Sequence, residues 1–478
     1  MSIDLNKKYY FNGSFEKRTI MNKITFTDFD KAQWVRVNDM GDMIVSQLDG
    51  SVTLKEIMSN ISLKFGISES VINELCADFL EKISDLGLIY SEEDATKMCE
   101  CGIAQENDAD QLEEETYPRS IWIHITGRCN LNCPFCYSKS GSNNTNILDR
   151  EDIYRYLSQI PVESRQEVVL SGGEPFTYPE LEELVRGLKE QMEFKTIRII
   201  SNGTIGHAVY DKIAPYISSI QFSVDGPVAE INDLSRGAGS FEKTLKGIRT
   251  ARKAGIKNLM ISITQTVDNY RYLRDMPQFL KDNEVYRLHI TRLMPVGRGR
   301  QSAETLGITQ NMFIHELDAF YEEYLRVARE IAMDREIYDV GLPMEEKRPN
   351  LFVTFAGDLV ERVNLRGRKV NCGLGKNIIS INYDGKLYAC PSLHMEPYCL
   401  GDINGNIKEA LLRGATLNEA LSVDNPDSDC NKCKYKYFCG GNCAARKLAM
   451  NGIGVEDLEC DTIRDTIDKH IATLDMEN

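Results

Sequence analysis

Cys129-Asn130-Leu131-Asn132-Cys133-Pro134-Phe135-Cys136 is the stretch that decides the fold of this chain. Its cysteines have the spacing Cys-x3-Cys-x2-Cys and follow an alternating apolar run, 121–126, that is typical of a strand. Three thiolates on one loop can hold three irons of a [4Fe–4S] cube and leave the fourth iron free, which makes the site a reaction centre; four cysteines would occupy every iron. A zinc site is the alternative, but zinc prefers four ligands, and this loop contains neither a histidine nor a fourth cysteine.

The loop resembles the signature of the radical S-adenosylmethionine (SAM) enzymes, Cys-x3-Cys-x-aromatic-Cys, with Phe135 in the aromatic place. The resemblance implies that Cys129, Cys133 and Cys136 hold the catalytic cluster, and that SAM chelates the free iron through its amino and carboxylate groups. It also implies that one electron from the cluster releases a 5′-deoxyadenosyl radical, which abstracts hydrogen from unactivated C–H bonds.

Length and composition limit the possible classes of protein. A chain of 478 residues is expected to form about two to four domains. The net charge of −16 argues against a nucleic-acid partner and against a membrane surface as partner. No run approaches the roughly 20 apolar residues of a membrane span, and residues 1–8 lack the pattern of a secretory signal. Fourteen cysteines without such a signal indicate a reducing compartment and metal ligation, so we expect a cytoplasmic protein.

Strands and helices alternate between residues 119 and 333. The expected strands are 120–126, 167–171, 196–201, 218–225, 258–265 and 286–291, and helices such as 181–188 and 241–254 separate them. Six β–α pairs predict an α/β fold with parallel strands, a partial (β/α)6 radical SAM barrel. The motifs follow directly after strands, at the end where such sheets place their chemistry.

The turns after these strands are expected to form the SAM pocket. In the run 171–175, Gly172 and Gly173 allow the backbone to approach a ligand closely, and the carboxylate of Glu174 can pair with an ammonium group. By resemblance this run is the GGE motif of the family, which holds the SAM amino group. The resemblance further makes residues 294–299 a candidate for the adenine side, and it suggests polar SAM contacts from Asn202, Ser223 and Arg236. An ordinary strand-end turn is the alternative for those three residues.

Seven more cysteines follow in a second set: Cys372, Cys390, Cys430, Cys433, Cys439, Cys443 and Cys460. The spacing resembles the SPASM extension of radical SAM enzymes, which implies two auxiliary [4Fe–4S] clusters and three clusters in all. By resemblance, one auxiliary cluster is closed by Cys430, Cys433, Cys439 and Cys460. The other is held by Cys372, Cys390 and Cys443.

The site of Cys372, Cys390 and Cys443 lacks a fourth cysteine between the first two. Cys399 could complete it. Otherwise the thiolate of a substrate cysteine could bind the open iron, which suits the soft chemistry of iron–sulfur clusters.

Residues 1–90 are expected to form a winged-helix-like domain, with a strand at 34–37 and helices at 40–48, 54–65 and 69–86. The pattern resembles the leader-binding domain of the peptide-maturation chaperone PqqD, in which an exposed strand edge accepts the leader of a precursor peptide. An acidic linker, 91–118, with ten carboxylates against one lysine, separates this domain from the barrel. A bridging region, 334–369, and the SPASM domain, 370–478, complete the expected organisation.

These features favour an enzyme that forms thioether crosslinks in a ribosomally made precursor peptide, and they resemble the sactipeptide and ranthipeptide maturases. The expected partners are the precursor peptide and an electron donor such as flavodoxin or ferredoxin. Carbon–carbon crosslinking, or oxidative decarboxylation as in mycofactocin maturation, is the alternative. Formylglycine-generating sulfatase maturation is weaker, because Pro391 stands where that family has an aspartate. A non-enzymatic electron carrier would need neither the GGE turn nor the barrel mouth.

Overall fold

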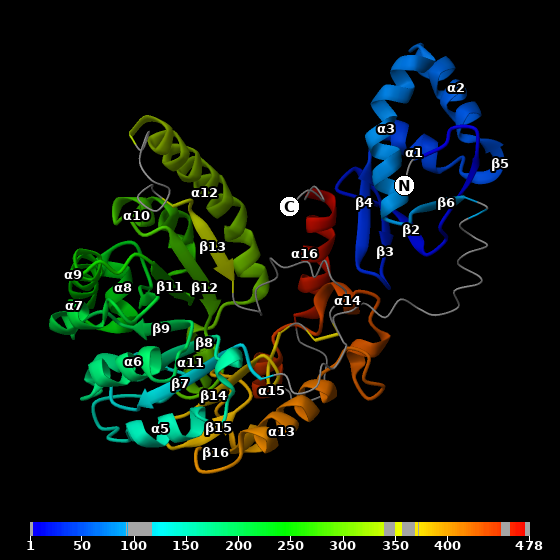
Figure 1. The fold of residues 1–478 in the computed structure, drawn as a ribbon. Helices are drawn as coiled ribbons and strands as arrows, with labels where there is room; N and C mark the ends of the chain where they lie inside the picture. Colours follow the sequence, from blue (N-terminus) through cyan, green and yellow to red (C-terminus); the bar gives the residue numbers. More distant parts are fainter. Residues whose placement is uncertain are drawn as a thin grey trace.

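The computed structural model describes residues 3–91, 93, 117–338, 349–355, 369, 370, 372–450 and 459–473. An N-terminal module, a large α/β unit and a C-terminal region of short helices make up the fold (Figure 1). Apolar side chains form three clusters: one in the α/β unit, one inside the module, and one shared by the module and the C-terminal region. Among the described residues, no helix has both the length and the apolar character needed to cross a membrane.

One sheet of ten strands organises the α/β unit. Across it the order is β13 (Phe352–Phe355), β12 (Arg287–Arg292), β11 (Leu259–Gln265), β10 (Ser219–Ser223), β9 (Thr196–Ser201), β8 (Glu167–Gly172), β7 (Ser120–Thr126), β14 (Ile378–Ile381), β15 (Lys386–Tyr388) and β16 (Cys399–Asp402). Neighbours from β13 to β14 are parallel, and β15 and β16 add antiparallel. In β9, β11 and β12 buried residues alternate with partly exposed ones, so one face of these strands is packed more closely than the other.

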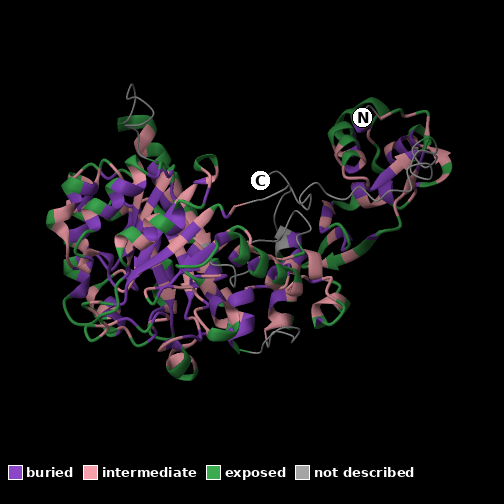
Figure 2. Ribbon diagram, turned by 60° about the horizontal axis from the view of Figure 1, so that its bottom comes forward, coloured by how far each residue is buried: buried purple, intermediate pink, exposed green. Residues whose placement is uncertain are grey.

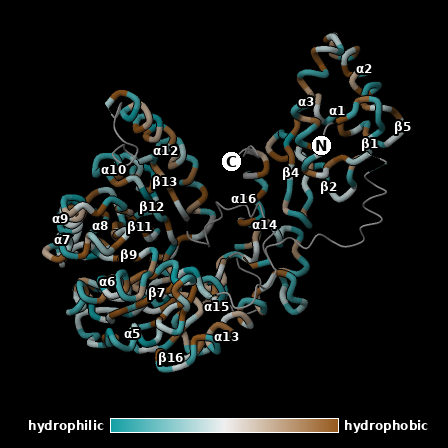
Figure 3. Tube along the Cα trace, in the orientation of Figure 1, coloured by the Kyte–Doolittle hydropathy of each residue, from teal (hydrophilic) through white to brown (hydrophobic). Residues whose placement is uncertain are grey.

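Helices connect the parallel strands and cover the sheet. They are α5 (Arg150–Leu157), α6 (Leu181–Glu190), α7 (Tyr210–Ile213), α8 (Ala229–Arg236), α9 (Ser240–Lys253), α10 (Met276–Asp282), α11 (Gly299–Leu306) and α12 (Gln310–Tyr338). Short 3-10 turns occupy Val162–Ser164, Pro175–Thr177, His207–Val209 and Tyr270–Asp275. Figure 2 shows the buried residues concentrated in the interior of this unit, and Figure 3 shows hydrophilic residues on the outer turns of α5 and α6.

The C-terminal region supplies four helices around loops that carry cysteines. They are α13 (Ile407–Ala420), α14 (Lys436–Cys439), α15 (Ala444–Met450) and α16 (Cys460–Thr473). Two 3-10 turns, Glu396–Tyr398 and Asp429–Lys432, lie in the connecting loops.

The N-terminal module has two small sheets and three helices. The sheet orders are β5 (Asp49–Thr53), β1 (Lys8–Phe11), β6 (Ile89–Ser91), and β2 (Phe15–Ile20), β3 (Lys23–Asp28), β4 (Gln33–Val37). The helices are α1 (Asp39–Val45), α2 (Leu54–Phe65) and α3 (Glu69–Asp85). A capping box of Thr53 and Glu56 begins α2, and Gly66 in the left-handed region ends it, so local chemistry sets both bounds.

The module docks on α16 through an apolar contact. One side of α16 presents Ile463, Ile467 and Ile471 at helical spacing, and these pack with Phe29 and Trp34 of the module in the shared cluster. Phe438 of α14 completes this cluster, with ring centroids 5.7 Å from Phe29 and 6.0 Å from Trp34. Burial of large apolar side chains is the main source of stability at such contacts.

Polar contacts frame the apolar cluster and fix its orientation. Arg18 donates to Asp468 (2.7 Å) and to the hydroxyl of Tyr435 (2.9 Å), and that hydroxyl donates to Asp468 (3.0 Å). Arg36 donates to the carbonyl of Ala472 near the end of α16 (2.9 Å). A two-point guanidinium–carboxylate contact is specific in direction, so these groups set how the module sits on α16.

All six expected strands of the barrel form, each within two residues of its expected ends. The expected strand and three helices of the module also form, but β1, β2, β3, β5 and β6 were not predicted, because their short, partly polar stretches lack a clear alternating pattern. The barrel is open, in agreement with the expected partial barrel, and β13 and β16 lie at its edges. One feature differs from the expected architecture: the sheet continues past residue 370, where β14 pairs with β7. Most of the acidic linker lies outside the described residues.

Replacing Ile467 with alanine is expected to release the module from α16, because Ile467 is fully buried in the shared cluster and Ile→Ala changes in cores cost about 2–5 kcal/mol. Trp34, one of two tryptophans, lies in this cluster and reports on it by fluorescence during a urea titration. The emission of Trp34 should shift at lower urea in Ile467→Ala than in Ile153→Ala, an equally buried change in the α/β unit. Identical Trp34 transitions in the two variants would contradict the docking role.

Candidate active site and cluster-binding sites

The cysteine loop leaves the carboxyl end of β7 and carries Cys129, Cys133 and Cys136, all partly buried and outside any disulfide. Burial raises the pKa of Cys129 to about 12, and it also raises the pKa of Cys133. A buried thiol becomes a thiolate only where positive charge shares the site, and metal ions supply such charge. The donor set of this loop therefore fits a metal cluster.

Arg298, which follows β12, fastens the backbone of the cysteine loop. Its Nε donates to the carbonyl of Cys133 (2.9 Å), and its Nη1 donates to the carbonyl of Ser140 (2.8 Å). The backbone N–H of Arg298 donates to the carbonyl of Cys136 (2.9 Å). Gly297 has φ 62°, and a Cβ there would lie 2.2 Å from a carbonyl oxygen of the loop. The stretch 294–299, expected beside the adenine, thus holds the cysteine loop itself.

The glycine turn after β8 holds the loop from the other side. Gly172 has φ 121°, and a Cβ on Gly173 would lie 2.1 Å from the carbonyl oxygen of Arg128. The N–H of Gly173 donates to the carbonyl of Thr126 (2.7 Å). Close approach of the two backbones therefore requires both glycines, and it places the expected GGE motif against the start of the cysteine loop.

Glu174 is fully buried, and its carboxylate joins two strand-end turns. It accepts hydrogen bonds from Ser201 Oγ (2.8 Å), the N–H of Asn202 (2.7 Å) and the N–H of Phe176 (3.2 Å). Burial raises the pKa of Glu174 to about 7, although these donors oppose the rise. A contact with a SAM amino group would thus add to three contacts that the carboxylate already makes.

Asn202 connects the turn after β9 to the cysteine loop. Its Nδ2 donates to Asn130 Oδ1 (3.0 Å) and lies 3.8 Å from Cys129 Sγ. Its Oδ1 accepts from the N–H of Thr204 (2.9 Å), and Asn130 Nδ2 donates to Thr204 Oγ1 (2.8 Å). The sequence-based candidate Asn202 therefore lies beside the first cysteine of the loop.

Arg236, at the end of α8, forms a buried ion pair with Asp225. Its Nε lies 2.7 Å from Asp225 Oδ2. Asp225 also accepts from Ser235 Oγ (2.8 Å) and from the N–H of Thr264 (2.9 Å). Burial lowers the pKa of Arg236, but Asp225 and the nearby Cys133 raise it above the ordinary value overall. A buried guanidinium beside the cysteine loop is suited to a carboxylate ligand.

Sequence reasoning missed the role of Asp225, and its position at the end of an expected strand was the available signal. The candidate Ser223 ends β10 and pairs in register with Ser262 of β11. Phe135, the aromatic residue of the motif, is buried within the loop. A cavity of about 290 Å³ opens beside the loop, lined by Asn130, Leu131, Asn132, Thr204, Arg236, Gly237, Ala238, Ser240 and Lys243.

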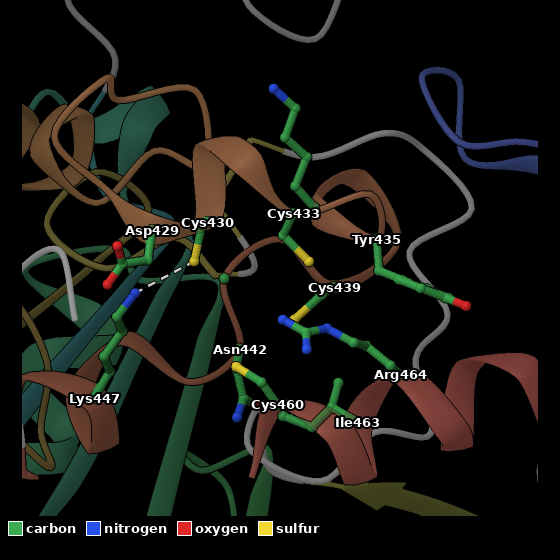
Figure 4. A pocket seen from close by; sticks show the side chains of 12 residues that line it. Asp429, Cys430, Cys433, Tyr435, Cys439, Asn442, Lys447, Cys460, Ile463 and Arg464 are labelled. Atoms are coloured by element: carbon green, nitrogen blue, oxygen red, sulfur yellow. Dashed lines mark hydrogen bonds between the residues drawn. The ribbon is translucent and has the colours of Figure 1, made fainter. Parts of the chain in front are cut away.

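Four cysteines of the second set surround one pocket: Cys430, Cys433, Cys439 and Cys460 (Figure 4). Burial raises the pKa of Cys439 to about 12, and the charges of Cys430 and Cys460 add to this effect. Lys447, itself buried, donates to Cys430 Sγ at 3.4 Å. Lys436 and Arg464 also line the pocket, and four thiols with these cations nearby fit a cluster that the protein closes completely.

Cys372, Cys390 and Cys443 pack against the apolar cluster of the α/β unit. Burial and the neighbouring charge of Cys372 raise the pKa of Cys390 to about 12. Cys443 directly precedes α15. Cys399 begins β16, and its thiol donates to the carbonyl of Gly401 (3.3 Å). Cys372, Cys390 and Cys443 thus come from separate segments of the chain.

A row of rings lies between the cysteine loop and Cys390. Tyr137 Oη lies 3.3 Å from His124 Nε2, and the rings of His124 and His394 are 4.5 Å apart. His394 stacks on Tyr388 at 4.7 Å and contacts Ser380 Oγ (3.0 Å). Burial lowers the pKa of His124 to about 4, so this imidazole is neutral at pH 7. His124 is thus a packed residue of β7.

Replacing Arg298 with alanine is expected to lower cluster occupancy at the cysteine loop, because two carbonyls of the loop lose their donors. Lysine at this position should restore little, since an ammonium cannot span both carbonyls as a guanidinium does. Iron content and the EPR signal of the reduced, SAM-bound protein measure the loss. Arg300→Ala, an exposed neighbour, is the control, and equal iron content in both variants would contradict the role of Arg298.

Comparisons with known proteins agree with this geometry. Residues 123–280 match the radical SAM superfamily, and residues 372–434 match the iron–sulfur cluster-binding domain SPASM. The AdoMet-dependent heme synthase of Methanosarcina barkeri is 26% identical over 355 residues, which cover 71% of this chain and 95% of the relative. The mycofactocin maturase MftC of Mycobacterium ulcerans is 26% identical over 361 residues, which cover 72% of this chain and 88% of the relative.

Solved structures extend the likeness in fold. anSMEcpe with bound AdoMet aligns with a TM-score of 0.55 and 17% identity, covering 75% of this chain and 100% of that chain. Streptococcus suis SuiB bound to S-adenosylmethionine aligns with a TM-score of 0.52 and 13% identity, covering 97% of this chain and 100% of that chain. The SuiB alignment therefore includes the N-terminal module. This chain carries an α/β radical SAM fold with a SPASM domain. These two domains support SAM and [4Fe–4S] clusters as its cofactors.

Proposed function

We propose that this chain is a radical SAM enzyme that modifies a ribosomally made precursor peptide by forming thioether bonds from cysteine sulfur to carbon. One observation carries the proposal: Cys372 and Cys390 lie together in a buried site, and the chain between them contains no further cysteine. With Cys443 assigned there by the SPASM spacing, three protein thiols leave one iron for another soft ligand. A substrate thiolate is such a ligand.

SAM bound at the cysteine loop supplies a 5′-deoxyadenosyl radical after one-electron reduction. The contribution of this chain is to hold the loop between Arg298 and the glycine turn. Asn202 and Arg236, which lie beside the loop, would offer an amide and a guanidinium to the polar groups of SAM, and Ser223 at the end of β10 would offer a hydroxyl. For each thioether, the radical would take one hydrogen atom from the acceptor carbon, the thiol would lose its proton, and the remaining electron would pass to the auxiliary cluster. The peptide therefore loses two hydrogens per crosslink.

The N-terminal module is proposed to bind the leader of the precursor. Strand β4 stands at the edge of its sheet and pairs only with β3 among the described strands. A Cβ on Gly41 would touch both Val37, at the end of β4, and Phe79 of α3, so this edge and α3 are neighbours. One and two turns before Phe79, Leu75 and Val71 are 63% and 43% exposed.

An unpaired strand edge beside an apolar helical stripe suits an extended peptide. The backbone of the peptide would continue the sheet, and its apolar side chains would pack on Val71 and Leu75. The SuiB structure bound to the precursor peptide SuiA aligns over 98% of this chain, at a TM-score of 0.51 and 13% identity, which supports a module of this fold in a peptide-modifying enzyme. We further propose a cytoplasmic enzyme that receives electrons from a flavodoxin or ferredoxin.

Carbon–carbon crosslinking or oxidative decarboxylation of a precursor is the second candidate, favoured by the similarity to mycofactocin maturase MftC. It would need no substrate thiol at the site of Cys372 and Cys390. Formylglycine formation is less suited, because Pro391 stands in the place of the expected aspartate. The likeness to anSMEcpe concerns the fold alone.

Mass spectrometry of a co-expressed precursor, taken from the neighbouring open reading frame, tests the reaction. We expect a product that has lost two hydrogens per crosslink and resists alkylation at cysteine. Cys390→Ala should abolish the crosslink but retain 5′-deoxyadenosine formation, and Cys129→Ala should abolish both. Cys76→Ala, buried inside the module, is the control. A product that has lost carbon dioxide, or a crosslinked precursor without cysteine, would establish the second candidate instead.

Leader binding is tested by Leu75→Asp, which places a charge on the exposed stripe of α3. We expect the affinity for a labelled leader peptide, measured by fluorescence anisotropy, to fall at least about tenfold, or about 1.4 kcal/mol. The matched control is Leu63→Asp on α2, since Leu63 is 83% exposed and lies outside the stripe. Equal losses in both variants would remove α3 from the leader site.

A further inference from the structure

Helix α9 is strongly basic in an acidic chain. Its sequence carries Lys243, Lys246, Arg249, Arg252 and Lys253 against a single acid, Glu242, whereas the whole chain has 56 basic and 72 acidic residues. Arg252 pairs with Glu284, and no ion pair is present for Lys243, Lys246, Arg249 or Lys253 within the described residues. These four side chains are exposed on the face of α9 that points away from the sheet.

The buried face of α9 is fixed close to the cysteine loop. Thr244 Oγ1 donates to the carbonyl of Asn202 (2.7 Å), and a Cβ on Gly247 would lie 2.4 Å from the carbonyl oxygen of Gly203. Asn202 in turn lies 3.8 Å from Cys129 Sγ. A single residue thus separates the basic helix from the first cysteine of the loop.

The cysteine loop reaches solvent beside the first turn of α9. Ser240 and Lys243 line the cavity of about 290 Å³ together with Asn130 and Asn132, and both asparagines are exposed. Arg128, at the start of the loop, is also exposed. The solvent-facing edge of the loop is therefore flanked by positive charge on two sides.

We propose that the exposed face of α9, next to the cysteine loop, is the docking surface for an acidic electron-carrier protein that reduces the cluster of that loop. This inference rests on the proposed function, which requires one electron for each SAM cleaved. The carrier loses that electron and the cluster gains it, and no bond or proton is exchanged. A charged surface next to the acceptor suits a transient redox encounter, in which steering by charge matters more than buried area.

The precursor peptide is a less suitable occupant of this surface. In Figure 1, α9 lies on the side of the α/β unit far from the N-terminal module, where the leader is proposed to bind. Acidic residues near α9 include Glu242 on the helix itself, Asp211 on the neighbouring α7, Glu230 on α8, and Glu284, which pairs with Arg252. They also include Asp233, whose carboxylate already accepts from the N–H groups of Gly239 and Phe241. The electrostatic field at the exposed face of α9 is thus determined by its lysines and arginines.

Reversing two charges, Lys246→Glu with Arg249→Glu, tests the surface without touching the cavity. The control reverses the charges of Arg186, on α6, and of Lys195, in the loop that follows α6. Both residues are exposed, and the two double variants change the net charge equally. With a reduced, acidic bacterial flavodoxin at low salt, we expect kcat/KM for flavodoxin in 5′-deoxyadenosine formation to fall at least about tenfold in the α9 variant only. With dithionite, which needs no docking surface, all three proteins should be equally active.

Salt and binding provide independent readouts. The flavodoxin-driven rate of the unaltered protein should fall as ionic strength rises, because charges are screened beyond about 10 Å at 0.1 M salt, and the rate of the α9 variant should respond little. The Kd for oxidised flavodoxin should rise at least about tenfold in the α9 variant. An unchanged Kd, or equal loss in the control, overturns the proposal. Absence of 5′-deoxyadenosine with dithionite would instead refute the proposed function, while the binding titration would still decide the surface.

Discussion

Burial of the three thiols in the cysteine loop is the constraint on which the rest of the structure depends. Desolvation disfavours the thiolate, as the raised pKa of Cys129 shows, so only a cation at the site can stabilise the charged ligand set. The loop backbone must therefore be held in place by the protein. Arg298, Gly173 and Gly297 do this from the ends of two different strands, β8 and β12. A parallel sheet brings those strand ends to one edge, which explains why this loop decides the fold.

Helix α16 likewise connects a cysteine site to the position of the N-terminal module. Its first residue, Cys460, lines the four-cysteine pocket, while Ile463, Ile467 and Ile471 hold the module through the shared cluster. Phe438 in that cluster directly precedes Cys439, a second thiol of the pocket. The four-cysteine pocket and the contact with the module thus involve the same two helices, so the N-terminal module is positioned next to that pocket.

The sequence predicts local and periodic features well and distant contacts poorly. The six barrel strands and the α2 and α3 helices follow from apolar periodicity, and the cysteine spacing indicates the cluster chemistry. The docking of Arg18 on Asp468 joins residues 450 positions apart, and nothing in either segment indicates the pairing. The roles of Arg298 and Asp225 also depend on which strand ends meet. The strand β2 escapes prediction because its exposed positions carry charged residues, which a half-buried strand shares with loops. The strand β3 escapes prediction because its buried positions include the polar residues Thr25, Thr27 and Asp28.

The two auxiliary sites differ in a way that bears on the reaction. The four-cysteine pocket includes a buried cation, Lys447, bonded to Cys430, which offsets the negative charge of a fully thiolate-ligated cluster. Near Cys390 the ionisable rings are His394 and His124, and burial lowers the pKa of both, so they bring no charge at pH 7. A site with three thiols has one negative charge fewer to offset than a site with four. The neutral state of His124 and His394 is therefore consistent with the proposal that a substrate thiolate completes this ligand set, whereas Lys447 at the other pocket is consistent with a set that the protein closes.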